Sequence, residues 1–120
     1  MITYLGKTYG CAMEMAINLI GGKWKGLILW QLAEKEVLRF GELRRIFPGL
    51  TQKMLTQQLR ELERDRIVHR EVYRQVPPKV EYSLTETGQS LFPVLKTLNE
   101  WGIDFLKQGI AAYTEDQPPA

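Results

Sequence analysis

The sequence contains very little of the chemistry from which catalytic and metal sites are usually built. Among its 120 residues it has one cysteine, Cys11, and one histidine, His69. These two residues cannot supply the four ligands of a structural zinc site, and no Ser/His/acid set or glycine-rich phosphate loop accompanies them. We therefore expect no enzyme activity, no metal and no cofactor, and we expect His69 to lie on the surface of a strand.

The sequence also lacks the features of an exported or membrane-bound protein. A single cysteine excludes an intrachain disulfide and fits a reducing compartment. No apolar run approaches the ~18 residues of a membrane-spanning helix. Residues 1–7 lack the basic start, apolar middle and small-residue cleavage site of a signal peptide. We expect a cytoplasmic protein with no membrane partner.

The composition that is present is typical of one globular domain with an uneven charge. Hydrophobic residues make up 44% and charged residues 25% of the chain, and a chain of this length can bury a single core. Residues 39–80 hold ten Lys/Arg against five Asp/Glu, whereas the remainder holds six against nine. This split gives net charges of +5 and −3, and it favours a polyanion as the partner of the basic segment.

Residues 51–65, inside this basic segment, have the pattern of an amphipathic helix. Leu55, Leu59 and Leu62 recur at helical spacing and form one apolar stripe. Thr51 follows a Pro-Gly turn, at the position where an N-cap belongs. The other face carries side chains of the types that reach base edges and phosphates: Gln52, Lys53, Thr56, Gln57, Arg60 and Arg64. It is either a DNA-reading face or the ordinary solvated face of an amphipathic helix.

The pattern upstream predicts three more helices. Apolar spacing indicates helices at residues 13–20, 24–34 and 40–46, and residues 37–39 are consistent with a short strand. The helix at 24–34 has so wide an apolar surface that we expect it to be nearly fully buried. Residues 1–12 show little periodicity and are expected to form an irregular arm. Two short helices joined by a tight turn, the second basic on its outer side, form the helix-turn-helix pattern.

A β-hairpin is predicted directly after this pair. Residues 67–73 and 80–84 alternate as strands do, and the prolines between them cannot donate ladder hydrogen bonds, so they belong in the loop. Such a hairpin after a helix-turn-helix is called a wing. It can simply cap a small core, but Arg74 and Lys79 flank the prolines, and this placement favours a contact of the loop with DNA.

The last segment predicts a long helix with a surface for a second copy of the chain. It begins at Thr85 as N-cap, extends to about Gln108 and bends at Pro93. Its apolar stripe is longer than one small domain needs, so we expect a dimer interface, although the helix could instead fold back over its own core. The expected interface residues are Met13, Ile17, Leu95, Leu98, Trp101 and Phe105. The domain would then span residues 13–108, between the arm at 1–12 and a flexible tail at 109–120.

Five stretches of the chain, taken in order, resemble the HxlR family of bacterial transcriptional regulators. They are IGGKWK at 20–25, RFGELRR at 39–45, TQKMLTQQLRELE at 51–63, VPPKVEYSLT at 76–85 and WG at 101–102. The resemblance covers about residues 11–105. It implies a mainly α, winged helix-turn-helix fold of MarR-like architecture with N- and C-terminal dimerisation helices. It also implies a homodimer, usually a repressor, that binds double-stranded operator DNA through the recognition helix and wing.

The resemblance also implies a role for Cys11, because several members sense electrophiles or oxidants through an N-terminal cysteine. A helix N-terminus would favour the thiolate, while Glu14 one turn on would oppose it. Redox sensing and a purely structural role therefore both stay open. If Cys11 is a sensor, its routes are a symmetric disulfide across the dimer, alkylation, or a mixed disulfide with a small thiol.

The chain departs from the family pattern at two positions. Ala12 follows the cysteine, where the family usually has proline, and Arg66 stands where it usually has glycine. If the helix stop there is left-handed, Arg66 carries a strain of roughly 1 kcal/mol that glycine would avoid. Alternatively, Arg66 adds a phosphate contact.

The candidate DNA contacts differ in their expected roles. Glutamine suits adenine and lysine suits guanine or phosphate, so Gln52, Lys53 and Gln57 are expected to face bases, with the methyl of Thr56 against a thymine. The remaining candidates, which are expected to meet phosphates or be merely solvated, are Arg44, Arg45, Arg60, Arg64, Arg74 and Lys79, while Thr51 caps the helix.

Two other functional classes stay open. One is a small-molecule-responsive regulator in which Trp24, Trp30 and Trp101 line a ligand cleft. The other is a winged-helix module that binds proteins. The positive charge of residues 39–80 favours DNA over the latter.

Overall fold

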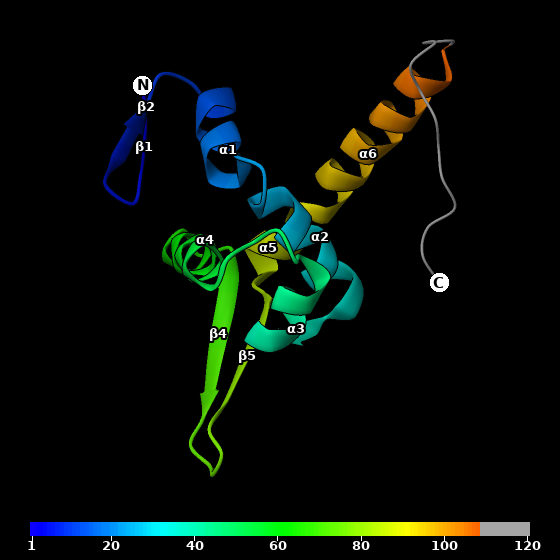
Figure 1. Ribbon diagram of the computed structural model, residues 1–120. Helices are drawn as coiled ribbons and strands as arrows, with labels where there is room; N and C mark the ends of the chain where they lie inside the picture. Colours follow the sequence, from blue (N-terminus) through cyan, green and yellow to red (C-terminus); the bar gives the residue numbers. More distant parts are fainter. Residues whose placement is uncertain (109–120) are drawn as a thin grey trace.

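A computed structural model describes residues 1–108 and confirms the mainly α, winged helix-turn-helix architecture (Figure 1). The predicted tail at 109–120 lies outside the described residues. The elements follow in the order β1 (Ile2–Tyr4), β2 (Lys7–Tyr9), α1 (Ala12–Ile20), α2 (Lys25–Lys35), β3 (Val37–Arg39), α3 (Phe40–Ile46), α4 (Gln52–Arg64), β4 (Val68–Tyr73), β5 (Lys79–Leu84), α5 (Glu86–Ser90) and α6 (Phe92–Lys107).

The apolar stripe of α4 is part of the core. Leu55, Leu59 and Leu62 are almost completely inaccessible and pack with residues of α2, α3 and the sheet. Burial of each such side chain contributes about 1.5–3 kcal/mol, so the stripe fixes which face of α4 remains outside. The expectation for residues 24–34 was wrong in part, because Leu27 on α2 is about half exposed.

Both ends of α4 are closed by backbone and side-chain hydrogen bonds. The hydroxyl of Thr51 accepts from the Met54 amide at 3.1 Å, which confirms the predicted N-cap. At the other end the Ile67 amide donates to the Leu62 carbonyl and the Arg66 amide to the Glu63 carbonyl. This is a Schellman stop. Arg66 has φ +63°, so the stop is left-handed. Arg66 therefore adopts the conformation that the family's usual glycine would adopt without strain.

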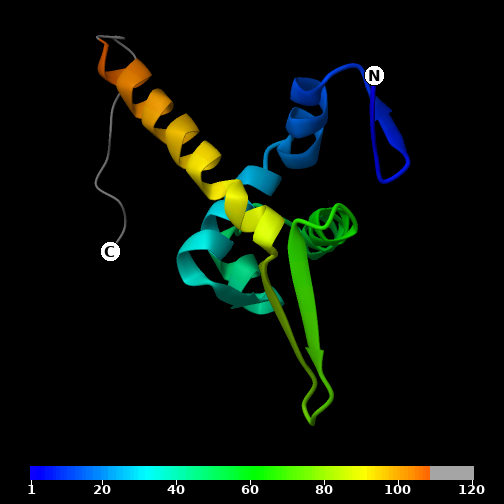
Figure 2. The ribbon, with the colours of Figure 1, turned by 180° about the vertical axis from the view of Figure 1, so that it is seen from behind.

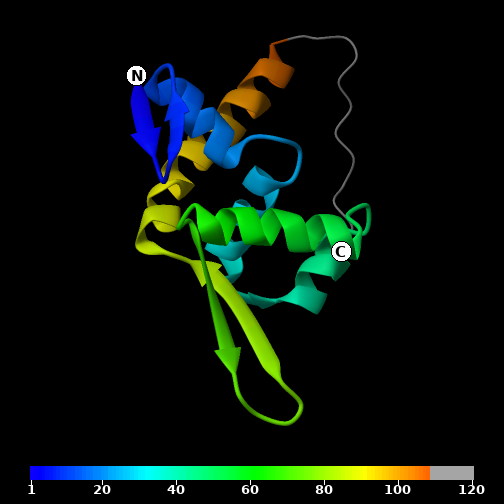
Figure 3. The ribbon, with the colours of Figure 1, turned by 90° about the vertical axis from the view of Figure 1, so that its left-hand side faces the viewer.

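The wing is two strands of a three-stranded antiparallel sheet with the order β3-β5-β4. The register places Leu38 and Arg70 on either side of Tyr82, and Glu71 directly opposite Glu81. Figure 3 shows the two long strands extending away from α4, which lies across their base. The strand at 37–39 therefore joins the wing instead of standing alone.

The last segment forms two helices, which corrects the prediction of one helix bent at Pro93. Helix α5 ends at Ser90 with Leu91 as its C-cap, and Pro93 lies in the first turn of α6, where the missing amide hydrogen costs no helical bond. Thr85 caps α5 and also donates to the Ile67 carbonyl. A Cβ on Gly88 would lie 2.2 Å from that carbonyl oxygen, so only glycine fits against it.

Residues 1–12 are more ordered than the sequence indicated. Strands β1 and β2 pair as an antiparallel hairpin, and the hydroxyl of Tyr4 donates to the carbonyl of Asp65, the C-cap residue of α4, at 2.7 Å. Strands of three residues are too short to show a reliable alternation, which is why the pattern gave no signal.

The domain has two ends. The wing projects on one side, while α1 and α6 rise on the opposite side, as Figures 1 and 2 show from the front and the back. None of the helices formed by residues 1–108 is both long enough and apolar enough to span a bilayer.

Candidate nucleic-acid interface

The outer face of α4 brings together the residues predicted to read DNA. Gln52, Lys53, Thr56, Gln57, Arg60 and Arg64 line one continuous polar surface together with Glu61. Because the leucines on the opposite side are buried, this face cannot rotate inward. The helix therefore presents its polar side chains to an external partner.

Hydrogen bonds within α4 limit what some of these side chains can do. The hydroxyl of Thr56 donates to the Gln52 carbonyl at 2.8 Å, so that proton is already used and its methyl is what remains for a partner. The Nε of Arg64 lies 3.4 Å from a carboxylate oxygen of Asp65. Gln57, Lys53 and Arg60 make no side-chain hydrogen bond or ion pair within residues 1–108.

A partly buried ion pair ties α4 to α2. Lys25, at the start of α2, is only 9% exposed, and its Nζ lies 3.1 Å from a carboxylate oxygen of Glu61. The pair neutralises Glu61, the acidic residue that lies among the candidate DNA-reading side chains of α4. The sequence alone does not reveal this pair, because Glu61 lies 36 positions further along the chain than Lys25.

The two arginines of α3 occupy different environments. Arg44 and Arg45 lie in its last turn, where positive charge suits the helix dipole. Arg45 is exposed, whereas the Nε of Arg44 is buried and has no hydrogen-bond partner among the described residues. An unpaired buried donor costs about 1–3 kcal/mol of stability, so an acceptor that binds this side chain would remove that cost.

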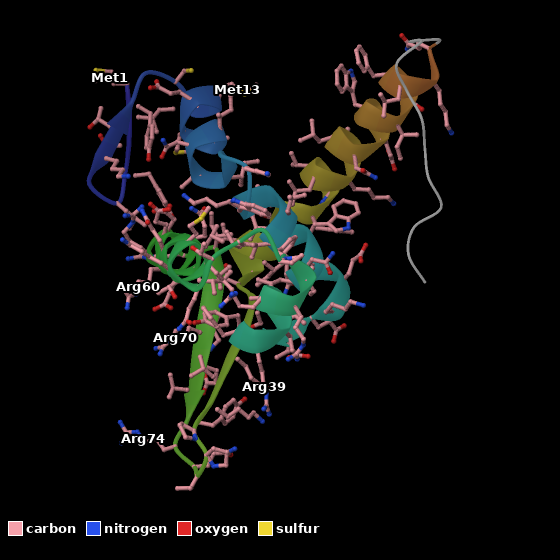
Figure 4. The ribbon with its side chains drawn as sticks, viewed as in Figure 1. Met1, Met13, Arg39, Arg60, Arg70 and Arg74 are labelled. Carbon is pink, nitrogen blue, oxygen red and sulfur yellow. The ribbon has the colours of Figure 1, made fainter. Side chains whose placement is uncertain are left out.

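Of the two cations near the wing tip, Lys79 is engaged and Arg74 makes no ion pair within residues 1–108. Arg74 is exposed and lies near the tip, as Figure 4 shows. The Nζ of Lys79 lies 3.9 Å from a carboxylate oxygen of Glu81 and 4.5 Å from the centre of the Tyr73 ring. A hydrogen bond to Glu81, then its charge, raises the pKa of Tyr73 above the ordinary value of 10.0, with smaller effects from burial and Glu71. Lys79 is therefore less available to DNA than Arg74.

Sequence reasoning did not select Arg70, although the structure places it beside the candidates. It projects from β4 on the side of the sheet that faces α4, and with Arg60 it lines a groove between α4 and the wing. Its alternation with Val68 and Val72 was visible in the sequence, but the side on which α4 lies was not.

Cys11 is exposed and immediately precedes α1. Its side chain makes no capping hydrogen bond, and the Glu14 carboxylate accepts from the Gly10 amide at 2.6 Å. The thiol is therefore accessible to a reagent, with an acidic side chain held one turn away.

The surface predicted for dimerisation is exposed and apolar, with one correction. Met13 and Ile17 on α1 and Phe105 on α6 are exposed, and Leu98 and Trp101 are 60% and 62% exposed. Leu95 is 7% exposed and belongs to the protein's own core, because it faces α2 from the first half of α6.

The three tryptophans do not form one cleft. Trp24 packs edge-on against Phe47, Trp30 against Phe92, and Trp101 stacks on Phe105. A groove of about 590 Å³ between α2 and α6 is lined by Trp30 but by neither of the others. Within residues 1–108 no cluster of His, Cys, Asp and Glu could hold a metal ion, and His69 lies 2.7 Å from Glu71 on the outer side of the wing.

Comparison with known proteins adds the family context. The family described as HxlR-like helix-turn-helix matches residues 19–110. The HTH-type transcriptional regulator YdeP of Bacillus subtilis is 57% identical over 93 residues, which cover 78% of this chain and 72% of YdeP. The structure of the redox regulator HypR in its oxidized form has 56% identity and a TM-score of 0.74 over 78% of this chain and 96% of HypR. The reduced form of the B. subtilis regulator YodB has 35% identity and a TM-score of 0.72 over 85% and 100%.

Proposed function

The chain belongs to the HxlR-like helix-turn-helix family and is a DNA-binding transcriptional regulator, and we propose that it represses transcription as a homodimer on operator DNA. The observation that carries the proposal is the outer face of α4. Its polar side chains form one exposed surface, the leucines behind it are buried, and the wing stands beside it. The working domain in this proposal is residues 13–108.

The proposed contacts divide into a front that reads bases and a periphery that holds the backbone. Gln52, Lys53 and Gln57 lie in the first two turns of α4, the part that enters the major groove in helix-turn-helix complexes. Thr56 offers its methyl. The backbone contacts are assigned to Arg44, Arg45, Arg60, Arg64, Arg74 and, more weakly, Lys79.

A second copy of the chain is the proposed occupant of the α1–α6 surface. Isolated exposed apolar residues need no explanation, but Leu98, Trp101 and Phe105 follow one side of a single helix. Burial of that stripe between two copies would place two α4 helices on one DNA. For two-fold dimers of this kind, half-sites lie about one helical turn apart or a multiple of it.

A salt titration tests the DNA-binding proposal. A dimer that makes about 8–10 phosphate contacts should show log K falling against log salt with a slope near −7 to −9. The measurement is fluorescence anisotropy with labelled duplex DNA. A flat dependence would reject DNA as the partner. The candidate partners would then be an apolar ligand of the α2–α6 groove or another protein. Binding of each to the same protein sample can be measured directly.

We also propose that Cys11 makes the regulator responsive to oxidants or electrophiles. The support is its exposure next to Met13 and Ile17, together with the similarity to HypR, a protein described as a redox regulator. In the symmetric route, two Cys11 thiols from the two protomers form one S–S bond and give two electrons and two protons to an oxidant such as diamide. An electrophile such as a quinone would instead alkylate the thiol.

The test of Cys11 is operator binding before and after diamide or quinone treatment. We expect treatment to weaken binding of the wild-type protein and to leave Cys11→Ser unchanged. Non-reducing electrophoresis distinguishes a cross-linked dimer from an alkylated monomer. An unchanged wild-type affinity after complete modification would leave Cys11 with a structural role.

A further inference from the structure

The groove between α4 and the wing contains two arginines from different elements. It has a volume of about 440 Å³, and Arg60 from α4 and Arg70 from β4 both line it. Figure 4 shows Arg60, Arg70 and Arg74 along the same side of the molecule, descending from α4 to the wing tip. Two cations from separate elements that line the same groove form a ready site for an anion.

A tyrosine hydroxyl adds a neutral donor to this groove. Tyr82 on β5 is directly opposite Arg70 in the sheet and is 8% exposed. Its hydroxyl makes no hydrogen bond within residues 1–108. The hydroxyl is nevertheless not a buried unpaired atom, since among the described residues only the Nε of Arg44 is one. Because Tyr82 lines the groove, its unpaired hydroxyl reaches solvent there. A largely buried tyrosine usually gives its hydroxyl a partner, and here an acceptor that enters the groove can reach it.

The charges around the groove favour an anion on this side of the wing only. Arg60 and Arg70 form no ion pair within residues 1–108, and the one acid that lines the groove is the exposed Glu63. The opposite side of the sheet is different. There Glu71 and Glu81 stand directly opposite each other, and their partners are His69 and Lys79. On that side Arg39, directly opposite Glu81, and Lys79 balance the two carboxylates, so the unbalanced positive charge lies on the side that faces α4.

We infer that this groove is a seat for one backbone phosphate of the operator, held by Arg60, Arg70 and the Tyr82 hydroxyl. The inference rests on the proposed DNA-binding function and adds a contact to it. If α4 enters the major groove and the wing enters the adjacent minor groove, the DNA strand that separates the two grooves must cross the space between α4 and the wing. That space is this groove. A phosphate held there sets how α4 lies in the major groove without reading any base.

Substitutions at Arg70 and Tyr82 test the seat. Arg70→Gln should reduce the steepness of the salt dependence by roughly 2 for a dimer, about one for each protomer. Tyr82→Phe should weaken binding several-fold and leave the salt slope unchanged, because it removes a donor but no charge. For each variant, the loss of affinity should be the same on operator DNA as on random DNA. Lys96→Gln, which removes one exposed charge from α6, is the matched control and should change neither quantity.

Phosphate ethylation interference separates a contact from a merely structural effect. In the wild-type protein, ethylation of the seated phosphate should block binding in each half-site. In Arg70→Gln that same modification should lose its effect, while interference at the other phosphates persists. The Arg70→Gln/Tyr82→Phe double variant should lose less affinity than the sum of the single losses, since both groups hold one phosphate. Unfolding curves check that each variant is folded.

The outcomes separate the seat from the proposed function. A wild-type affinity that does not depend on salt overturns the DNA-binding proposal itself. A steep wild-type dependence with an Arg70→Gln slope equal to that of Lys96→Gln overturns the seat alone. An interference pattern unchanged by Arg70→Gln also overturns the seat, whatever the affinity.

Discussion

The α4–wing surface and the α1–α6 surface are both exposed, but their side chains differ in chemistry. The α4–wing surface carries amides and cations, whereas the α1–α6 surface carries Met13, Ile17, Leu98, Trp101 and Phe105. They lie at opposite ends of the domain (Figure 1). A polar, cationic surface remains hydrated when unoccupied and gains from a polyanion. An exposed apolar stripe gains only when another apolar surface covers it.

The same α2 helix supports both surfaces. Its first residue, Lys25, pairs with Glu61 on α4, and Trp30 further along contacts Phe92 of α6. A change in how two copies pack through α6 would therefore alter the contact of α6 with α2. Because α2 is paired with α4, it could also shift the position of α4.

The largest expected effect comes from a charge placed in the apolar surface. Leu98→Asp should convert the dimer to a monomer and lower operator affinity by about 100-fold or more, because the second half-site no longer adds to the first. Sedimentation velocity and anisotropy measure the two quantities. Lys96→Ala changes the charge by the same amount on the same helix and should leave both unchanged. A Leu98→Asp protein that is still dimeric would show that the interface lies elsewhere.

The next effect separates the front of the DNA surface from its periphery. Gln57→Ala should cost about 1–3 kcal/mol on operator DNA and little on random DNA, because base contacts specify the sequence. Arg74→Ala should weaken binding equally on both, since a backbone contact only positions the protein. Competition titrations with the two DNAs measure the difference. Equal losses for both variants on both DNAs would refute the division.

A smaller effect is expected at the stop of α4. Arg66→Gly should raise the free energy of unfolding by about 1 kcal/mol, because glycine adopts the left-handed conformation without strain. Urea denaturation measures it, with Arg45→Gly in the last turn of α3 as a control that should destabilise. If Arg66 also meets a phosphate, the variant will bind DNA with a shallower salt slope. A loss of stability would show that the side chain has another role.

The smallest effect concerns the side of the wing that faces away from α4. Tyr73 should titrate above its ordinary pKa of 10.0, first because its hydroxyl donates to Glu81, and Glu81→Gln should bring that pKa back down. Because the pKa of Tyr73 is raised in the folded state, any stabilisation of the fold by this interaction is present below the pKa of the unfolded state. It is lost as the pH rises through the folded-state pKa. Ultraviolet absorbance of tyrosinate measures the titration. At neutral pH this substitution should not reduce DNA binding, in contrast to changes on the side of the wing that faces α4.

Much of the fold could be predicted because the signals involved are local. Residues 40–46 form a helix with the predicted bounds, Thr51 caps α4 as expected, and two strands flank the prolines of the wing. Periodicity, caps and turn residues act over a few positions, so each can be read in a short window. Pro93 was misplaced within its helix because the same residue fits a bend or a first turn, and which of them occurs depends on where α5 ends.

The sequence by itself determined the helix-turn-helix and wing, the polar character of the outer face of α4 and the family. The tertiary structure decided which surfaces are covered. It buried Leu95 but left Leu98 exposed on the same helix, tied Lys25 to Glu61, docked the N-terminal hairpin on the end of α4 and placed Arg70 and Tyr82 across a groove from Arg60. The physical reason is range: conformational preference is a property of neighbouring residues, whereas burial and pairing depend on elements that meet only after the chain has folded.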